Sequence, residues 1–232
     1  MRNEKIAGDV VSKFLNDDLE EFENNLADYL GVKYAYGVAD GTNALILALQ
    51  AAGIGKNDEV ILPSHTYIAT AAAVHFTGGK PVLVECGRDH MIDPESVRKA
   101  ITPKTKAIMP VQLNGRTCNM DSILEIANEN NLKIIEDSAQ ALGSKFKNKY
   151  AGTFGVAGTF SFYPTKNLGT LGDGGAIVTN TESFYIKAKH LHQYGWTSRY
   201  RNDIPYGRNS RMDEIHAAIL SVKLPHLEHW NS

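Results

Sequence analysis

The sequence is poor in cysteine, in charge imbalance and in long apolar runs, and each shortage narrows the class of protein. Its two cysteines, Cys86 and Cys118, show no C-x-x-C spacing, so a reduced cytoplasmic protein is the simplest interpretation. Two cysteines still allow one disulfide as the alternative. The net charge of −2, with both signs interleaved, argues against nucleic acid or a polybasic membrane surface as partner. No apolar run approaches the roughly 18 residues of a membrane span, and the start lacks the apolar core of a secretory signal.

Several common site motifs are missing as well. There is no G-x-x-x-x-G-K-[ST] phosphate loop, and "GDGGAI" departs from a dinucleotide fingerprint because Ile177 stands in place of the third glycine. His190 and His192 are two residues apart and would face different sides of a helix, so we expect no metal site there. His226 and His229 can share a face, but they read as solvated surface.

Short apolar segments with strand character alternate with helix-like segments along the chain. The strand candidates are residues 34–39, 59–63, 80–85, 106–111, 133–137, 159–163 and 175–180, and the helix candidates between the early strands are residues 42–53, 67–78, 93–101 and 120–131. Alternation with nearly continuous apolar strands predicts an α/β fold, with a mostly parallel sheet covered by helices on both faces. Ligands bind such sheets beyond the carboxyl ends of the strands.

The two ends of the chain read as helical. Residues 1–30 form an N-terminal helical segment, in which the apolar positions at near-helical spacing are Phe14, Leu15, Leu19, Phe22, Leu26 and Leu30. Residues 31–232 form the large domain. The last helix candidate, 212–232, is interrupted by Pro225 and reaches the chain end without a closing domain, which we interpret as the absence of a C-terminal portion.

The segment "TFSFYPTKNLGTLGDGGAIVTN" places Lys166 between an apolar strand and a glycine-rich loop. In the strand, Phe160 and Phe162 would face one side, and Ser161 and Tyr163 the other. A lysine amine attacks carbonyls only when it is neutral, which requires partial desolvation or a neighbouring cation. The alternative is an ordinary surface lysine in a turn, so a functional role needs further parts of the same site.

Other segments offer those parts. Asp137 ends an apolar strand at the ligand-binding edge, where a carboxylate can keep a pyridine nitrogen protonated; a turn or helix-cap aspartate is the alternative. Gly41 and Thr42 begin a helix, whose free N–H groups can hold a phosphate or simply form a capped end. Ser161 offers a second phosphate hydroxyl, and Tyr67 offers a ring that either covers an aromatic cofactor or only packs.

Three motifs together resemble one family. "EDSAQALG", "FSFYPTKNLGTLGDGGAIVTN" and "GRNSRMDEIHAAIL" are similar to the DegT/DnrJ/EryC1/StrS sugar aminotransferases, and the resemblance runs from about Phe14 to the chain end. It implies an aspartate-aminotransferase-like (fold type I) large domain that binds pyridoxal 5′-phosphate (PLP). Because family members are longer, it also implies that the C-terminal small domain is absent here.

The resemblance assigns a role to four residues around the cofactor ring. Lys166 would be the Schiff-base lysine and the proton shuttle. Asp137 would pair with the pyridinium nitrogen, and Gln140 would contact the ring hydroxyl oxygen. Tyr67 matches the position of the stacking aromatic residue.

Four further residues are assigned to the phosphate. Gly41, Thr42 and Ser161 would hold it within the subunit. Asn209, in "GRNSRMDE", matches an asparagine that reaches the cofactor phosphate of the neighbouring subunit. The resemblance therefore also implies a homodimer.

The implied reaction moves an amino group from an amino-acid donor, usually glutamate in this family, to a keto group of a nucleotide-linked sugar. The segment "HQYGWTSRYRNDIPYGRNSRMDEI" is similar to that of enzymes acting on dTDP-linked 3-keto-6-deoxyhexoses, with amination at C3 or C4 left open. Where many relatives read "PVHLYG", this chain has Gln112 and Asn114, which leaves substrate contacts there undefined.

Two alternatives compete with this interpretation. The PLP-dependent sugar dehydratases of the same fold carry histidine in place of the Schiff-base lysine, so Lys166 speaks against them. A truncated chain can also be catalytically incomplete, and it would then act as a PLP-binding remnant, a scaffold or a regulatory subunit.

Overall fold

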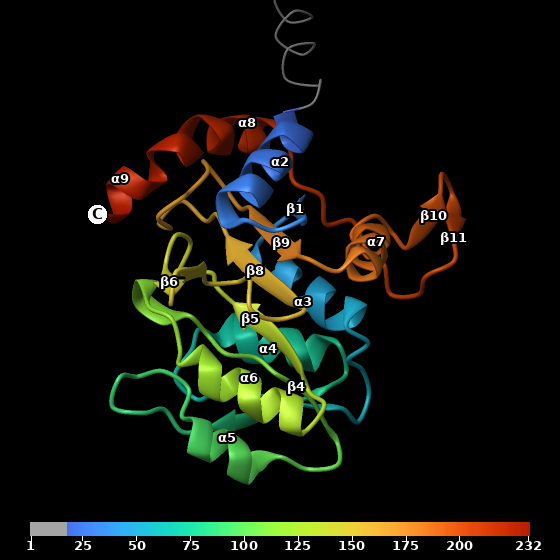
Figure 1. Ribbon diagram of the computed structural model, residues 1–232. Coiled ribbons are helices and arrows are strands. Elements are labelled where there is room, and N and C mark those ends of the chain that lie inside the picture. Colours follow the sequence, from blue (N-terminus) through green and yellow to red (C-terminus); the bar gives the residue numbers. More distant parts are fainter. Residues whose placement is uncertain (1–17) are drawn as a thin grey trace, which may run out of the picture.

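The centre of the protein is a seven-stranded sheet, seen in a computed structural model that describes residues 18–232 (Figure 1). The strand order is β1-β9-β8-β5-β4-β2-β3. The bounds are β1 Tyr34–Val38, β2 Glu59–Pro63, β3 Lys80–Val84, β4 Thr105–Ile108, β5 Lys133–Asp137, β8 Ala157–Ser161 and β9 Gly175–Thr179. Among these strands only β9 runs in the direction opposite to the other six, so the predicted mostly parallel sheet is confirmed.

Strand β9 reverses direction because of its connection to β8. The segment between Ser161 and Gly175 contains no helix, and parallel neighbours need a long crossover, usually a helical one. The two strands therefore pair as a wide hairpin, and its loop carries Lys166. The loop is closed by hydrogen bonds from Phe162 N to Gly174 O at 2.8 Å and from Thr170 N to Phe162 O at 2.9 Å.

Helices cover both faces of the sheet, as the sequence predicts. The face with Val60, Leu62 and Ile177 packs against α3 (Gly41–Ala51), α4 (Ile68–Phe76) and α7 (Glu182–Leu191). On the opposite face, Ile61 belongs to a cluster with α5 (Pro94–Ala100) and α6 (Met120–Glu129). Val178 belongs to another with α2 (Asp18–Leu30), α8 (Glu214–Lys223) and α9 (Leu227–Asn231). Neighbouring strand residues thus enter different cores, which explains the unbroken apolar runs.

Three details differ from the sequence expectation. Helix α7 was not predicted, because it buries only Phe184, Ala188 and Leu191, and its other apolar residue Ile186 is exposed. Strand β8 begins earlier and ends at Ser161, since the chain then turns at Pro164 into the lysine loop. Two small hairpins, β6–β7 (Lys145–Phe146 and Lys149–Tyr150) and β10–β11 (Trp196–Ser198 and Arg201–Asn202), lie outside the main sheet.

The ends of the described chain pack together. Helix α2 lies against α8, and its side chains Phe22, Leu26 and Leu30 are buried as predicted. Phe14 and Leu15 lie outside the described residues, and the division at residue 30 stays a prediction. The C-terminal helix is broken around Pro225 by a short 3-10 turn, Leu224–His226, as expected. Within residues 18–232, every helix is too short or too polar to cross a lipid bilayer.

A fully buried carboxylate, Glu136, ties strand β5 to its surroundings on the face opposite the pocket described below. Its Oε2 accepts hydrogen bonds from Gln112 Nε2 at 2.9 Å and Gly152 N at 2.8 Å. Its Oε1 accepts from Phe154 N at 2.6 Å and Gly155 N at 3.1 Å. Burial, the largest effect, raises the pKa of Glu136 above its usual value, and these four donors oppose this shift. Because every partner is a donor, the site is built for a carboxylate.

We predict that Glu136→Gln destabilises the protein by about 2–4 kcal/mol, because either amide orientation sets an NH₂ group against two buried donors. Urea unfolding would measure the change. Glu125→Gln is the matched control, since Glu125 is an exposed partner of Arg98 and its loss should cost under about 1 kcal/mol. Equal effects of the two substitutions would contradict the assigned role of Glu136.

Candidate functional site

A pocket of about 660 Å³ opens at the carboxyl edge of the parallel strands. It lies between the ends of β5 and β8 and the beginnings of α3 and α4, as expected for a sheet of this kind. Seven of the eight predicted site residues line it: Gly41, Thr42, Tyr67, Asp137, Gln140, Ser161 and Lys166. Residues far apart in the sequence therefore meet in one place.

The eighth, Asn209, lies elsewhere. It is exposed and forms an antiparallel bridge with Gln193, in the segment that follows the β10–β11 hairpin. It does not contribute to the pocket of its own chain, so its predicted role toward a neighbouring subunit stays a prediction.

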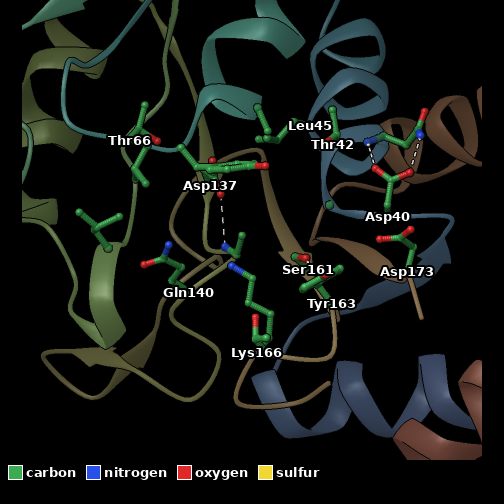
Figure 2. A pocket seen from close by; sticks show the side chains of 18 residues that line it. Asp40, Thr42, Leu45, Thr66, Asp137, Gln140, Ser161, Tyr163, Lys166 and Asp173 are labelled. Carbon is green, nitrogen blue, oxygen red and sulfur yellow. Dashed lines mark hydrogen bonds between the residues drawn. The ribbon is translucent and has the colours of Figure 1, made fainter. Parts of the chain in front are cut away.

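One end of the pocket is the N-terminus of α3. The carboxylate of Asp40 accepts hydrogen bonds from Asn43 N at 2.8 Å and from the Asn43 side chain at 2.7 Å, which caps the helix (Figure 2). The cap does not use the N–H groups of Gly41 and Thr42, which lie at the pocket. A side chain at position 41 would place its Cβ 2.7 Å from Ser161 Cβ, so glycine allows helix and strand to approach. The N–H groups of Gly41 and Thr42 and the hydroxyls of Thr42 and Ser161 thus belong to residues that line this end of the pocket, where the helix dipole favours an anion.

The glycines of the lysine loop serve protein packing. A Cβ at position 175 would lie 2.5 Å from the carbonyl carbon of Asp40, and one at position 169 would lie 2.7 Å from Pro164 O. Gly175 therefore lets β9 support the start of α3 from behind. None of these glycines is among the described residues that line the pocket.

Asp137 is the buried acid of the pocket. Its Oδ2 accepts a hydrogen bond from Thr70 Oγ1 at 2.7 Å, and its Oδ1 accepts one from Ala139 N at 3.2 Å. Burial, the largest effect, raises the pKa of the Asp137 carboxyl above its usual value, and Thr70, Ala139 N and the positive charge of Lys166 oppose this shift. A carboxylate has about four acceptor sites, so Asp137 can accept a further hydrogen bond from a cation in the pocket.

Lys166 enters from the loop after β8, and Figure 2 shows its side chain extending toward the side of the pocket where Asp137 lies. Its position is set by a tight turn, in which Lys166 N donates to Tyr163 O at 2.8 Å and Pro164 occupies the second place, where proline is favoured. Lys223 Nζ donates to Gly169 O, so α8 braces the far side of the loop. Ser161 and Tyr163 lie beside Lys166, as strand alternation predicts (Figure 2).

Gln140 is held in one orientation. Its Oε1 accepts a hydrogen bond from Asn114 N at 3.0 Å, so its NH₂ group remains to donate to a ligand. Asn114 has a left-handed backbone with φ of 53°, which asparagine tolerates better than most residues. Gln112, in contrast, is fully buried against Glu136 and Cys118, and its side chain therefore serves packing behind the sheet.

Sequence reasoning missed several residues of the pocket. Thr66, Leu45, Val111, Leu113 and Asp173 also line it, and Thr66 contacts Thr70 at 2.6 Å between the two hydroxyl oxygens. The spacing of Thr66 and Thr70, four residues apart around Tyr67 at a helix start, was the available signal. The side chain of Tyr67 is exposed by 71%, so its ring is free to cover a bound ligand.

Comparison with known proteins agrees with this geometry. A model of the DegT/DnrJ/EryC1/StrS aminotransferase family matches residues 8–232. The chain is 49% identical over 218 residues to the dTDP-3-amino-3,6-dideoxy-alpha-D-galactopyranose transaminase of Aneurinibacillus thermoaerophilus, covering 94% of this chain and 60% of that protein. It is 46% identical over 218 residues to the dTDP-3-amino-3,4,6-trideoxy-alpha-D-glucose transaminase of Streptomyces venezuelae, covering 94% and 57%.

A solved structure gives the same relationship. The crystal structure of NtdA from Bacillus subtilis with bound cofactor PMP has a TM-score of 0.86 to this chain at 38% identity, covering 91% of this chain and 48% of that one. The predicted fold type I architecture is therefore confirmed. The chain spans 57–60% of the length of the two transaminases and 48% of NtdA. It belongs to the DegT/DnrJ/EryC1/StrS aminotransferase family, whose members depend on PLP.

Proposed function

We propose that the protein containing this chain is a PLP-dependent aminotransferase that transfers an amino group to a keto group of a nucleotide-linked sugar. The observation that carries this proposal is the convergence of Lys166, Asp137 and the anion site at α3 in one pocket. Each of these groups alone has an ordinary structural explanation. Together they match the three functional parts of PLP: an aldehyde, a pyridine nitrogen and a phosphate.

The residues present fit this cofactor. A buried carboxylate with hydrogen-bonding capacity to spare, Asp137, suits a protonated ring nitrogen. Gly41 leaves room beside Ser161 where a Cβ would intrude, and N–H groups and hydroxyls surround that space. The NH₂ group of Gln140 would donate to the ring oxygen, and the ring of Tyr67 would cover one face. When bound, PLP supplies an electron sink that stabilises negative charge at the carbon attached to the amino group.

The chain's own residues would then divide the work. Lys166 Nζ would hold the cofactor at its aldehyde carbon and would serve as the base that moves a proton at the substrate carbon. Asp137 keeps the ring nitrogen protonated. The start of α3 fixes the phosphate, so the reacting atoms stay aligned with Lys166.

The finer assignments rest on resemblance and on the names of relatives. We propose glutamate as amino donor from the family resemblance, and a dTDP-linked 3-keto-6-deoxyhexose as acceptor because two relatives at 46–49% identity are named as transaminases of dTDP-amino sugars. A homodimer is proposed because Asn209 is exposed away from its own pocket. Cys86 and Cys118 are both free thiols, which supports the proposed cytoplasmic location.

The alternative is a cofactor-binding chain without turnover, acting as a scaffold or regulator. Lys166 argues against a dehydratase, which carries histidine there.

We predict that borohydride reduction of the PLP-loaded protein attaches the cofactor to Lys166, found by peptide mapping. Lys166→Ala should abolish the label and reduce amino transfer by at least about 10²–10⁴-fold, because it removes the proton-transferring base. Lys187→Ala, at an exposed position on α7, is the control and should keep both.

Glutamate separates the two candidate functions. Glutamate added to the PLP-loaded protein, without borohydride, should bleach the absorbance of the bound cofactor. A dTDP-linked keto sugar should then restore that absorbance. An unlabelled Lys166 in saturated protein would falsify the proposal, whereas a labelled lysine without bleaching would favour the binding-only alternative.

We also predict that Gly41→Ala weakens PLP binding by roughly tenfold or more, because the new Cβ displaces Ser161 or the start of α3 from the phosphate. Affinity for pyridoxal, which lacks the phosphate, should change little. Gly55→Ala is the matched control, since a Cβ there meets no atom within 4 Å. Equal losses for PLP and pyridoxal would show that α3 does not hold the phosphate.

A further inference from the structure

A chain of hydroxyl groups leads from the pocket wall to the buried acid. Thr70 is fully buried in the first turn of α4, and its Oγ1 donates to Asp137 Oδ2 at 2.7 Å. The hydroxyl of Thr66, which lines the pocket, lies 2.6 Å from Thr70 Oγ1. Neither threonine is among the residues assigned to the cofactor.

The direction of these hydrogen bonds is fixed by the charge of the acid. An ionised carboxylate only accepts, so Thr70 must spend its single hydroxyl hydrogen on Asp137. The hydrogen between the two threonines therefore comes from Thr66. The relay runs from Thr66 through Thr70 to Asp137, and it holds when Asp137 is ionised.

The same segment carries the pocket's aromatic ring. Tyr67 lies between the two threonines and precedes α4, and Thr70 N donates to Tyr67 O at 3.1 Å. Residues 66–70 thus place a ring over the pocket and a hydrogen-bond donor on its buried acid in one rigid turn. Displacing this turn would alter both together.

We infer that Thr70 is a positioning residue that keeps Asp137 ionised and aimed at the ring nitrogen of the cofactor, and that Thr66 orients Thr70. This inference rests on the proposed function. Its physical basis is that the carboxylate is buried, where an ionised group persists only if donors compensate for lost water. Ala139 N supplies one donor at 3.2 Å, and the shorter bond comes from Thr70.

Other charged groups near the pocket can also affect the pKa of Asp137. Lys166 approaches from the loop after β8 and lowers the pKa of Asp137. Asp40 and Asp173 lie toward the α3 side, away from Asp137 in Figure 2. Glu136 precedes Asp137 on β5 and so points to the opposite face, where its donors lie. Variants should therefore leave these groups unchanged.

The test is the pH dependence of PLP affinity, followed by absorbance, in Thr70→Val, Thr70→Ser and Thr66→Val. Binding needs ionised Asp137, so affinity falls as pH falls through its pKa. The Thr70 hydrogen bond lowers that pKa. Its removal should therefore move the fall in affinity at low pH, the acid limb of the profile, up by about one pH unit, and should weaken binding about tenfold on that limb. Thr70→Ser should behave as the unsubstituted protein, and Thr66→Val should shift the limb less, in the same direction.

Thr77→Val is the matched control, because Thr77 follows the same helix and its hydroxyl donates to Val74 O, outside the pocket. An acid limb in Thr70→Val that coincides with that of Thr77→Val overturns the inference. Should Thr70→Val not fold, as judged by thermal unfolding, Thr66→Val and Thr70→Ser decide the same question. If the unsubstituted protein fails to bind PLP, the proposed function fails with it, whereas normal binding with an unmoved limb removes only the relay.

Discussion

The carboxylate of Asp137, buried at the end of β5, is the constraint on which the rest of the site depends. Burial disfavours its charge, so the fold supplies hydrogen bonds from Thr70 and Ala139 and places Lys166 nearby. These come from α4, from the turn after β5 and from the loop after β8. Three separate segments of the chain must therefore meet around one buried charge.

The antiparallel strand β9 is what makes the lysine loop possible. Because β8 and β9 pair as a hairpin, the loop between them starts and ends at the ligand-binding edge of the sheet. The return strand then packs Gly175 against the Asp40 backbone, so the same strand that closes the lysine loop also supports the anion site. Lys166 and the start of α3 are therefore mechanically connected.

Strand β5 carries two acidic residues with opposite roles. Asp137 faces the pocket and keeps acceptor capacity for a ligand, whereas Glu136 faces the other side and is saturated by four donors. Gln112, a site where the chain departs from the common motif of its family, belongs to the Glu136 network. The replacement of the common histidine by Gln112 therefore affects packing on the face of the sheet away from the pocket.

The sequence by itself indicated the order of strands and helices, the two-sided burial of the sheet and the candidate roles of Lys166 and Asp137, because strand periodicity and the Lys166 segment are local properties. It could not place Thr70 beside Asp137, 67 residues away, or Gly175 beside Asp40. Nor did it indicate α7, whose narrow buried face packs against β1 and α3. Such pairings depend on how the crossovers stack helices on the sheet, and only the tertiary structure decides that.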